Sequence, residues 1–196
     1  METSKAIETR VSCRNFISKE IPREYLNQIL ESARQAPSPK NRQPWRFLVL
    51  QDKKKEDFEK LISIPEDTAS YISPAAKKLK EWDSWKKSYE CIKKATAIIL
   101  VFNAYPSSVI LDEPNMLFDI TNIQAIGASI QNMLLKASDL GVSSLWICDI
   151  FSHYQIICNR YYPTGQLIAA IAFGYSEKDS VKSTRKSLEQ LLIEEV

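Results

Sequence analysis

Two arginines and a serine alternate near the start of this 196-residue chain, as Arg10, Ser12 and Arg14. In an extended backbone, side chains two residues apart point to the same side, so these three groups would converge on one spot. Guanidinium groups form charge-assisted hydrogen bonds to phosphate, each worth roughly 1.5–3 kcal/mol net. Residues 10–16, which we call the arginine segment, therefore indicate either a site for a phosphate or another planar anion, or a solvated polar edge.

A second polar cluster lies in residues 36–45, which read APSPKNRQPW and which we call the proline loop. Pro37, Pro39 and Pro44 stiffen the backbone of this loop. Asn41 and Gln43 each carry a hydrogen-bond donor and an acceptor, the groups needed to read the edge of a heterocycle. The same residues also fit a well-hydrogen-bonded turn that binds nothing.

A third basic group follows a predicted strand that ends near Gly174, and it contains Lys182, Arg185 and Lys186. Basic residues just past a buried strand can reach back over the end of the sheet. They can also be part of a solvated tail, and both interpretations are open.

Residue counts exclude several other sites. Only four glycines are present and no two are close together, so the chain has neither a Gly-x-Gly-x-x-Gly motif nor a P-loop. A bound phosphate would have to be held by side chains. His153 is the single histidine and no triad signature surrounds it, so we expect a surface or helix-capping residue and no metal site. The four cysteines form no Cys-x-x-Cys pair, which argues against disulfides and a zinc knuckle.

Charge and hydropathy limit the class of protein. Lys plus Arg number 26 and Asp plus Glu number 24, and this near-neutral balance argues against a nucleic-acid binder or a basic membrane-surface protein. The longest apolar run, residues 95–102, is far shorter than the roughly 20 residues that span a bilayer. Residues 1–16 have no apolar core for a signal peptide. These features predict a cytoplasmic protein with one domain over residues 1–196.

Apolar spacing predicts alternating helices and strands in a three-layer α+β fold, with a central mixed or antiparallel sheet flanked by helices. The wide apolar surface of the longest helix suits either a central helix of a monomer or a subunit interface. Residues 105–114 are expected to form a loop, and residues 183–192 a short helix or a tail. We expect helices from Ile21 to before Pro37 and at 53–62, 74–94 (one or two) and 116–140, and strands at 47–50, 97–102, 144–148 and 168–173.

The combination Arg-x-Ser-x-Arg-x-Phe in the arginine segment and Ala-Pro-Ser-x-x-Asn-x-Gln-Pro-Trp in the proline loop resembles the nitroreductase family of flavoproteins. The stretch 139–147 resembles the family's helix-to-strand passage. Residues 168–175 followed by Arg185 resemble its last core strand and phosphate-binding basic residue. The resemblance extends from about Ile7 to Leu192 and leaves residues 63–94 as a variable region without a family signature.

This resemblance implies an intertwined homodimer that binds FMN in two clefts at the subunit interface. It implies that Arg10, Ser12 and Arg14 contact the phosphate, ribityl chain and pyrimidine end of one FMN. It also implies that Arg185 closes the phosphate site. The remaining implied contacts are Pro37, Ser38 and Pro39 of the other subunit against the ring system, Asn41 and Gln43 as hydrogen-bond partners of the flavin, and Cys148 and Asp149 beside its reactive N5.

One departure from the family lies at Cys148-Asp149, where several members carry a glutamate-glycine pair. A backbone N–H can still serve N5 there, while Asp149 adds bulk and charge. Cys148 is either a redox partner of the flavin or an inert cysteine in a buried strand.

The implied activity is hydride transfer from NAD(P)H, as co-substrate, through FMN to a nitroaromatic, a quinone or a similar acceptor. Arg14 would stabilise negative charge on the reduced ring, and no side-chain acid or base is obligatory. Alternatives are an FMN carrier or sensor with little turnover, or a specialised flavin enzyme such as a reductive dehalogenase. In the variable region, four aromatic residues form either a lid that stacks the acceptor or a face packed on the protein body: Tyr71, Trp82, Trp85 and Tyr89.

Overall fold

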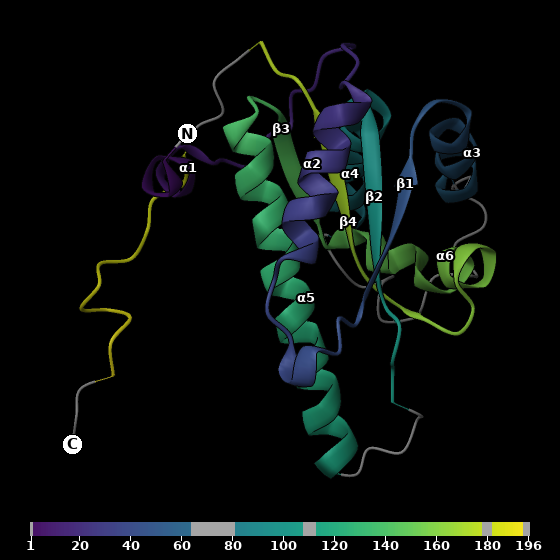
Figure 1. The fold of residues 1–196 in the computed structure, drawn as a ribbon. Coiled ribbons are helices and arrows are strands. Elements are labelled where there is room, and N and C mark those ends of the chain that lie inside the picture. The colour runs from purple at the N-terminus through teal and green to yellow at the C-terminus, as the bar shows by residue number, and fades with distance from the viewer. Residues whose placement is uncertain (1, 64–80, 108–112, 178–181, 194–196) are drawn as a thin grey trace.

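The computed structural model of the protein describes residues 2–63, 81–107, 113–177 and 182–193 (Figure 1). Along the chain its elements are α1 (Thr3–Thr9), α2 (Arg23–Arg34), the 3-10 helix η1 (Pro39–Asn41), β1 (Trp45–Leu50), α3 (Asp52–Ile62), α4 (Glu81–Lys94), β2 (Ala97–Asn103), α5 (Glu113–Asp139), β3 (Ser143–Ile147), the 3-10 helix η4 (Asp149–His153), α6 (Tyr154–Tyr161) and β4 (Gln166–Gly174).

The four strands form one sheet in the order β1-β2-β4-β3, and every neighbouring pair is antiparallel. All seven residues of β2 are buried, because this central strand is covered on both faces. Its side chains alternate between two cores. Ile98, Leu100 and Phe102 pack in the core that contains residues of α3, α4 and α6. Ala97, Ile99 and Val101 pack in the core that contains residues of α2 and α5.

Two helical layers therefore enclose the sheet, with α2 and α5 on one face (Figure 1). This arrangement confirms the predicted three-layer α+β fold. On this face of the sheet, α5 packs against α2. There the Ser129 hydroxyl donates to the carbonyl of Ala33 at 3.0 Å, and the Asn132 amide donates to the carbonyl of Ser32 at 3.1 Å.

The arginine segment is attached to the edge of the sheet. The Cys13 N–H donates to the Ser144 carbonyl at 2.9 Å, and the Ile17 N–H donates to the Tyr175 carbonyl at the same distance. Between these two bonds, the buried ring of Phe16 packs directly on Gly174. A Cβ at Gly174 would lie 2.7 Å from Phe16 Cδ1, so only glycine fits at this position without displacing the ring.

Several local predictions differ from the structure. Helices α1 and α6 and the 3-10 helix η4 were not predicted, because such short segments carry little periodic signal. Helix α5 begins at Glu113, so Pro114 lies in its first turn, where proline is tolerated, rather than in a loop. Of the two alternatives for residues 183–192, the structure has the tail, which runs past α1 and away from the body (Figure 1).

Within the described parts of the chain, no helix combines the length and the apolar character that crossing a membrane requires.

Candidate functional site

The arginine segment presents its polar side chains along the outer edge of β3. Ser12 forms a parallel bridge with Ser144, so the segment runs in the same direction as the strand. Ser12 and Arg14 are exposed and Arg10 is half-buried. Among the described residues, neither guanidinium group has a hydrogen bond or an ion pair. Two uncompensated cations and a hydroxyl on one edge are the donors that a phosphate requires.

Strand β3 leads from this edge to Cys148 and Asp149, at its other end. The strand ends at Ile147, and Cys148 adopts helical backbone angles (φ −88°, ψ −28°) before η4. Cys148 is therefore exposed, and the description of it as a buried strand cysteine is wrong. Partial desolvation and the neighbouring Asp149 charge raise the pKa of its thiol. A thiol with a raised pKa is protonated at neutral pH, so the structure gives no support to a redox role.

The carboxylate of Asp149 faces helix α4. Its Oδ2 accepts hydrogen bonds from the hydroxyls of Ser84 and Ser88, each at 2.8 Å. These two serines are not among the site residues predicted from the sequence. Their spacing of four residues places them on one helical face and is the signal that could have identified them.

His153 is buried, which corrects the expectation of a surface or helix-capping residue. It occupies the N-cap position of α6, but its side chain forms no capping hydrogen bond. The ring is 2% exposed and lies 4.3 Å from the ring of Trp85, and Nδ1 is 2.8 Å from the Ser152 hydroxyl. Burial lowers the pKa of His153 from 6.5 to about 4, so the ring is neutral at pH 7. Ile150 lies three residues before His153 and Ile157 lies four residues after it. This apolar spacing is the sequence pattern that could have predicted the burial of His153.

Two of the four aromatic residues proposed for a lid are described in full. Trp85 is 5% exposed and packs in the core, as the packing alternative predicts. Tyr89 is half-buried, with its ring centroid 6.1 Å from that of Trp85 and its hydroxyl donating to the Glu59 carbonyl at 3.4 Å. Tyr71 and the side chain of Trp82 lie outside the described residues.

The proline loop forms a tight turn that is anchored on α5. Lys40, Asn41 and Gln43 have positive φ angles of 53°, 52° and 49°, a left-handed conformation that favours asparagine over the other two. The Ser38 hydroxyl accepts a hydrogen bond from the Gln43 N–H at 2.9 Å, and the Gln43 amide donates to Asn41 Oδ1 at 3.2 Å. Part of the hydrogen-bonding capacity of both amides is therefore used inside the turn. Pro37 and Pro39 are exposed beside them.

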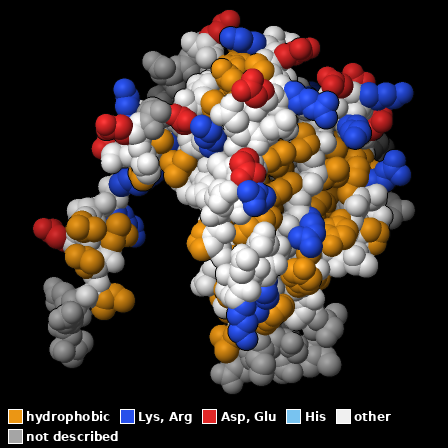
Figure 2. Space-filling view, viewed as in Figure 1, with side chains coloured by type: hydrophobic (Ala, Val, Ile, Leu, Met, Phe, Trp, Pro, Cys, Tyr) orange, Lys and Arg blue, Asp and Glu red, His pale blue; other side chains and the backbone are white. Residues whose placement is uncertain are grey.

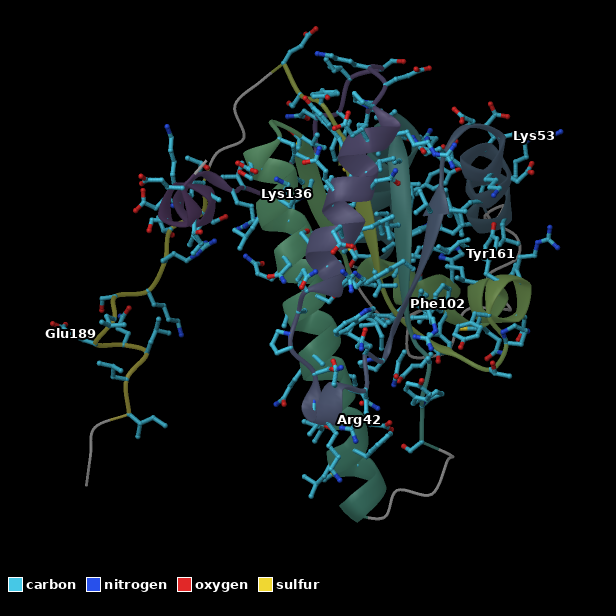
Figure 3. All side chains as sticks on the ribbon, in the orientation of Figure 1. Arg42, Lys53, Phe102, Lys136, Tyr161 and Glu189 are labelled. Atoms are coloured by element: carbon cyan, nitrogen blue, oxygen red, sulfur yellow. The ribbon has the colours of Figure 1, made fainter. Side chains whose placement is uncertain are left out.

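The proline loop and the arginine segment lie near opposite ends of α5. Arg42 of the loop donates to Thr121 at 3.0 Å, whereas Thr9, just before the arginine segment, lies 3.5 Å from Ser138 through their hydroxyls. Figure 3 shows the same separation between Arg42 and Lys136. Thr121 and Ser138 are 17 positions apart on one helix, which corresponds to about 25 Å. One copy of the chain therefore does not bring the two clusters together.

Arg185 lies in the exposed C-terminal tail. Its guanidinium donates to the carbonyls of Ser183 at 3.1 Å and Thr184 at 3.4 Å. The Lys182 ammonium donates to the Glu8 carbonyl at 2.6 Å, which holds the start of the tail beside α1. Beyond this contact the tail extends away from the body, as the position of Glu189 shows (Figure 3). No hydrogen bond described for Arg185 joins it to the arginine segment.

Comparison with known proteins identifies the family. Residues 7–175 match the model of the nitroreductase family. The chain belongs to the nitroreductase family. The match includes the arginine segment, the proline loop and all four strands. It ends before the tail that carries Arg185.

Individual relatives of this nitroreductase-family protein match it over different shares of its length. Over 100 residues, 48% of this chain, it is 34% identical to the iodotyrosine deiodinase of Thermotoga neapolitana, and the matched part spans 52% of that protein. It is 27% identical to a Haemophilus influenzae protein provisionally named as an NAD(P)H nitroreductase, over 89% of this chain and 87% of the other.

A solved structure extends the likeness over the whole chain. It is the FMN complex of a protein from Desulfovibrio desulfuricans that is provisionally named as a nitroreductase. That protein is 28% identical to this nitroreductase-family chain, with a TM-score of 0.72 and a coverage of 100% of this chain and 98% of the other.

Proposed function

We propose that this protein is an FMN-dependent oxidoreductase that passes hydride from NAD(P)H through bound FMN to a nitroaromatic, a quinone or a similar acceptor. The observation that carries the proposal is the arginine segment, with two guanidinium groups that have no partner among the described residues and an exposed serine on the edge of β3. Family membership and the FMN bound by the Desulfovibrio relative support it. A cytoplasmic location is part of the same proposal.

The residues of the arginine segment fit FMN chemically. Arg10 and Arg14 supply charge against a phosphate, and Ser12 supplies a neutral donor and acceptor between them. When bound here, FMN would supply hydride transfer between two substrates. Arg14 would stabilise negative charge on the reduced ring, and the backbone at Cys148 and Asp149 would lie on the side of its reactive N5. Arg185 would close the phosphate site if the tail, which extends away from the body in one copy (Figure 3), folded over the arginine segment.

We further propose that two copies of the chain complete each site. The separation of about 25 Å between the two clusters supports this, because Pro37, Ser38, Pro39, Asn41 and Gln43 of one copy can serve a site only on another. Both helix α5 and the tail expose apolar side chains that a second copy would cover. Met116, Leu117, Ile120 and Ile123 form an apolar stripe on α5 and are 41–52% exposed. In the tail Leu188, Leu191 and Leu192 are 61–70% exposed, and Figure 2 shows orange side chains on the part of the tail that lies apart from the body.

Titration of the purified protein with FMN tests the cofactor proposal. We expect the flavin fluorescence to change until about one FMN is bound per chain, and the loaded protein to oxidise NADH or NADPH when a quinone or a nitroarene is present. Protein that takes up no FMN would contradict the proposal. Bound FMN that neither nicotinamide reduces would favour the carrier or sensor alternative.

A further inference from the structure

Helix α4 is held to η4 through a single carboxylate oxygen. Asp149 Oδ2 accepts the hydroxyl hydrogens of Ser84 and Ser88, each at 2.8 Å. The two serines are one helical turn apart and lie on the same face of α4. Hydrogen bonds to a carboxylate are stronger than those between neutral groups, so these two bonds restrain the position of α4 more than ordinary surface contacts do.

A ring contact joins the same two elements beside these bonds. Trp85 of α4 lies with its ring centroid 4.3 Å from that of His153 in η4, at an interplanar angle of 34°. Both side chains are buried, with 5% and 2% exposure. The first turns of α4 are therefore attached to η4 by two hydrogen bonds and one aromatic contact.

The other half of α4 reaches the arginine segment. The Cys91 thiol donates to the backbone carbonyl of Arg14 at 3.5 Å, and Cys91 is 5% exposed. Ser84, Ser88 and Cys91 follow at spacings of four and three residues, so they share one helical face. This face of α4 spans the distance between Asp149 and the backbone of Arg14.

We propose that Asp149 is a positioning residue that fixes α4, and through α4 the backbone of Arg14, relative to the corner formed by Cys148 and Asp149. The proposal rests on the proposed function, because these two places are the ends of the flavin site inferred above. The role of the carboxylate is to accept two serine hydroxyls, rather than to place a charge on the cofactor. Its loss loosens α4 and widens the site.

Because both hydroxyls donate to one oxygen, substitutions can separate the loss of the hydrogen-bond acceptor from the loss of the charge. Asparagine has one carbonyl oxygen with two lone pairs, so Asp149→Asn can still accept both hydroxyls while it removes the charge. Asp149→Ala removes the acceptor and the charge. The double variant Ser84→Ala/Ser88→Ala removes the same two hydrogen bonds and leaves Asp149 in place.

Hydrogen exchange of the cofactor-free protein, followed by mass spectrometry, tests the position of α4 directly. We expect amides of residues 84–92 to exchange at least about tenfold faster in Asp149→Ala and in the double serine variant, because both hydrogen bonds to the carboxylate are lost. Asp149→Asn should stay within a few-fold of the parent protein. Lys87→Ala, on an exposed part of the same helix, is the matched control and should change nothing.

Steady-state kinetics of the FMN-loaded variants test whether a looser α4 weakens binding of the acceptor. We expect KM for the acceptor to rise about tenfold in Asp149→Ala and in the double serine variant, with a smaller change in kcat and with recovery in Asp149→Asn. An unchanged exchange rate in Asp149→Ala would overturn the positioning role. The positioning role would also be wrong if Asp149→Asn had the exchange rate and KM of Asp149→Ala while the double serine variant had those of the parent protein. The lost charge, rather than the lost hydrogen bonds, would then cause the change. Failure of the parent protein to bind FMN would end the proposed function and leave the exchange result valid.

Discussion

Arg14 carries a charge that the described part of the chain leaves without an ion-pair partner. Some other cations of the protein are paired, for example Arg34 with Glu31 and Lys136 with Asp139. An exposed guanidinium costs little in water, so stability does not explain why Arg10 and Arg14 flank Ser12 on one edge. In the proposed function, a ligand with a complementary negative charge accounts for this arrangement.

Replacement of Arg14 by alanine should weaken FMN binding about tenfold or more, because a hydrogen bond from a charged group is lost. Fluorescence titration with FMN measures this change. The matched control is Arg160→Ala, which removes an exposed arginine from α6. Equal FMN affinities for Arg14→Ala and the parent protein would remove the role assigned to Arg14.

His153 makes the stability of the protein depend on pH. Burial lowers its pKa from 6.5 to about 4. Between these two values the unfolded chain binds a proton that the folded chain does not, so the free energy of unfolding falls as the pH drops through this window. The expected loss is about 3 kcal/mol when the pH reaches the lower value.

Urea unfolding of the parent protein and of His153→Gln, at pH 7 and at pH 4.5, tests this prediction. The difference between the two proteins should change by about 2–3 kcal/mol between these pH values, because glutamine does not titrate. Ser152→Ala, which removes the hydroxyl beside Nδ1 and keeps the histidine, should retain the pH dependence. A difference that is the same at both pH values would contradict the pKa shift.

At the scale of elements, the edge of the sheet decides where the arginine segment lies. The segment contributes a backbone hydrogen bond at Cys13 and the buried ring of Phe16, and Ile17 directly after it contributes a second backbone hydrogen bond. The missing side chain at Gly174 of β4 is what allows this ring to approach. Position 174 is therefore connected to the candidate site although it bears no functional group.

Gly174→Ala should destabilise the protein by about 1–3 kcal/mol, because the new Cβ would overlap the Phe16 ring. Displacement of the ring should also weaken FMN binding. The double variant Gly174→Ala/Phe16→Leu has a smaller side chain at the contact and should recover part of the stability. Thermal unfolding and FMN titration measure both effects. A single variant as stable as the parent would show that the ring adapts without cost.

At the scale of the whole molecule, the apolar stripe of α5 is the main exposed hydrophobic surface on the described part of the body. Met116, Leu117, Ile120 and Ile123 lie on the half of the helix that carries the proline loop. The same helix is buried against the sheet further along, at Ile130 and Met133. An apolar surface that continues beyond its own core is typical of a subunit interface.

Replacement of Ile120 by glutamate places a charge in the apolar stripe. If the stripe joins two copies, the variant should sediment at half the mass of the parent protein and lose FMN, because each proposed site needs the proline loop of a second copy. Analytical ultracentrifugation and FMN titration measure these outcomes. Ile156→Glu on α6 changes an apolar residue of similar exposure, 38%, and should alter neither. An unchanged mass and FMN affinity in Ile120→Glu would exclude the stripe as the interface.

The sequence by itself determined the main elements and the family. The apolar run of β2, the long periodic pattern of α5 and the motifs of the arginine segment and the proline loop are local, so they can be read without a structure. The alternation of neighbouring side chains also predicts that β2 serves two cores. Short elements such as α1 and α6 contain too few residues for a periodic apolar pattern to be recognised in the sequence.

Only the tertiary structure decided which distant residues meet. The bonds of Asp149 to Ser84 and Ser88 join residues 65 and 61 positions apart. The burial of His153 depends on Trp85, from another helix, and the exposure of Cys148 depends on where β3 ends. The distance between the two polar clusters depends on the length of α5 that separates them. These features arise from packing between elements, and packing depends on the positions of all of them at once rather than on any local pattern of residues.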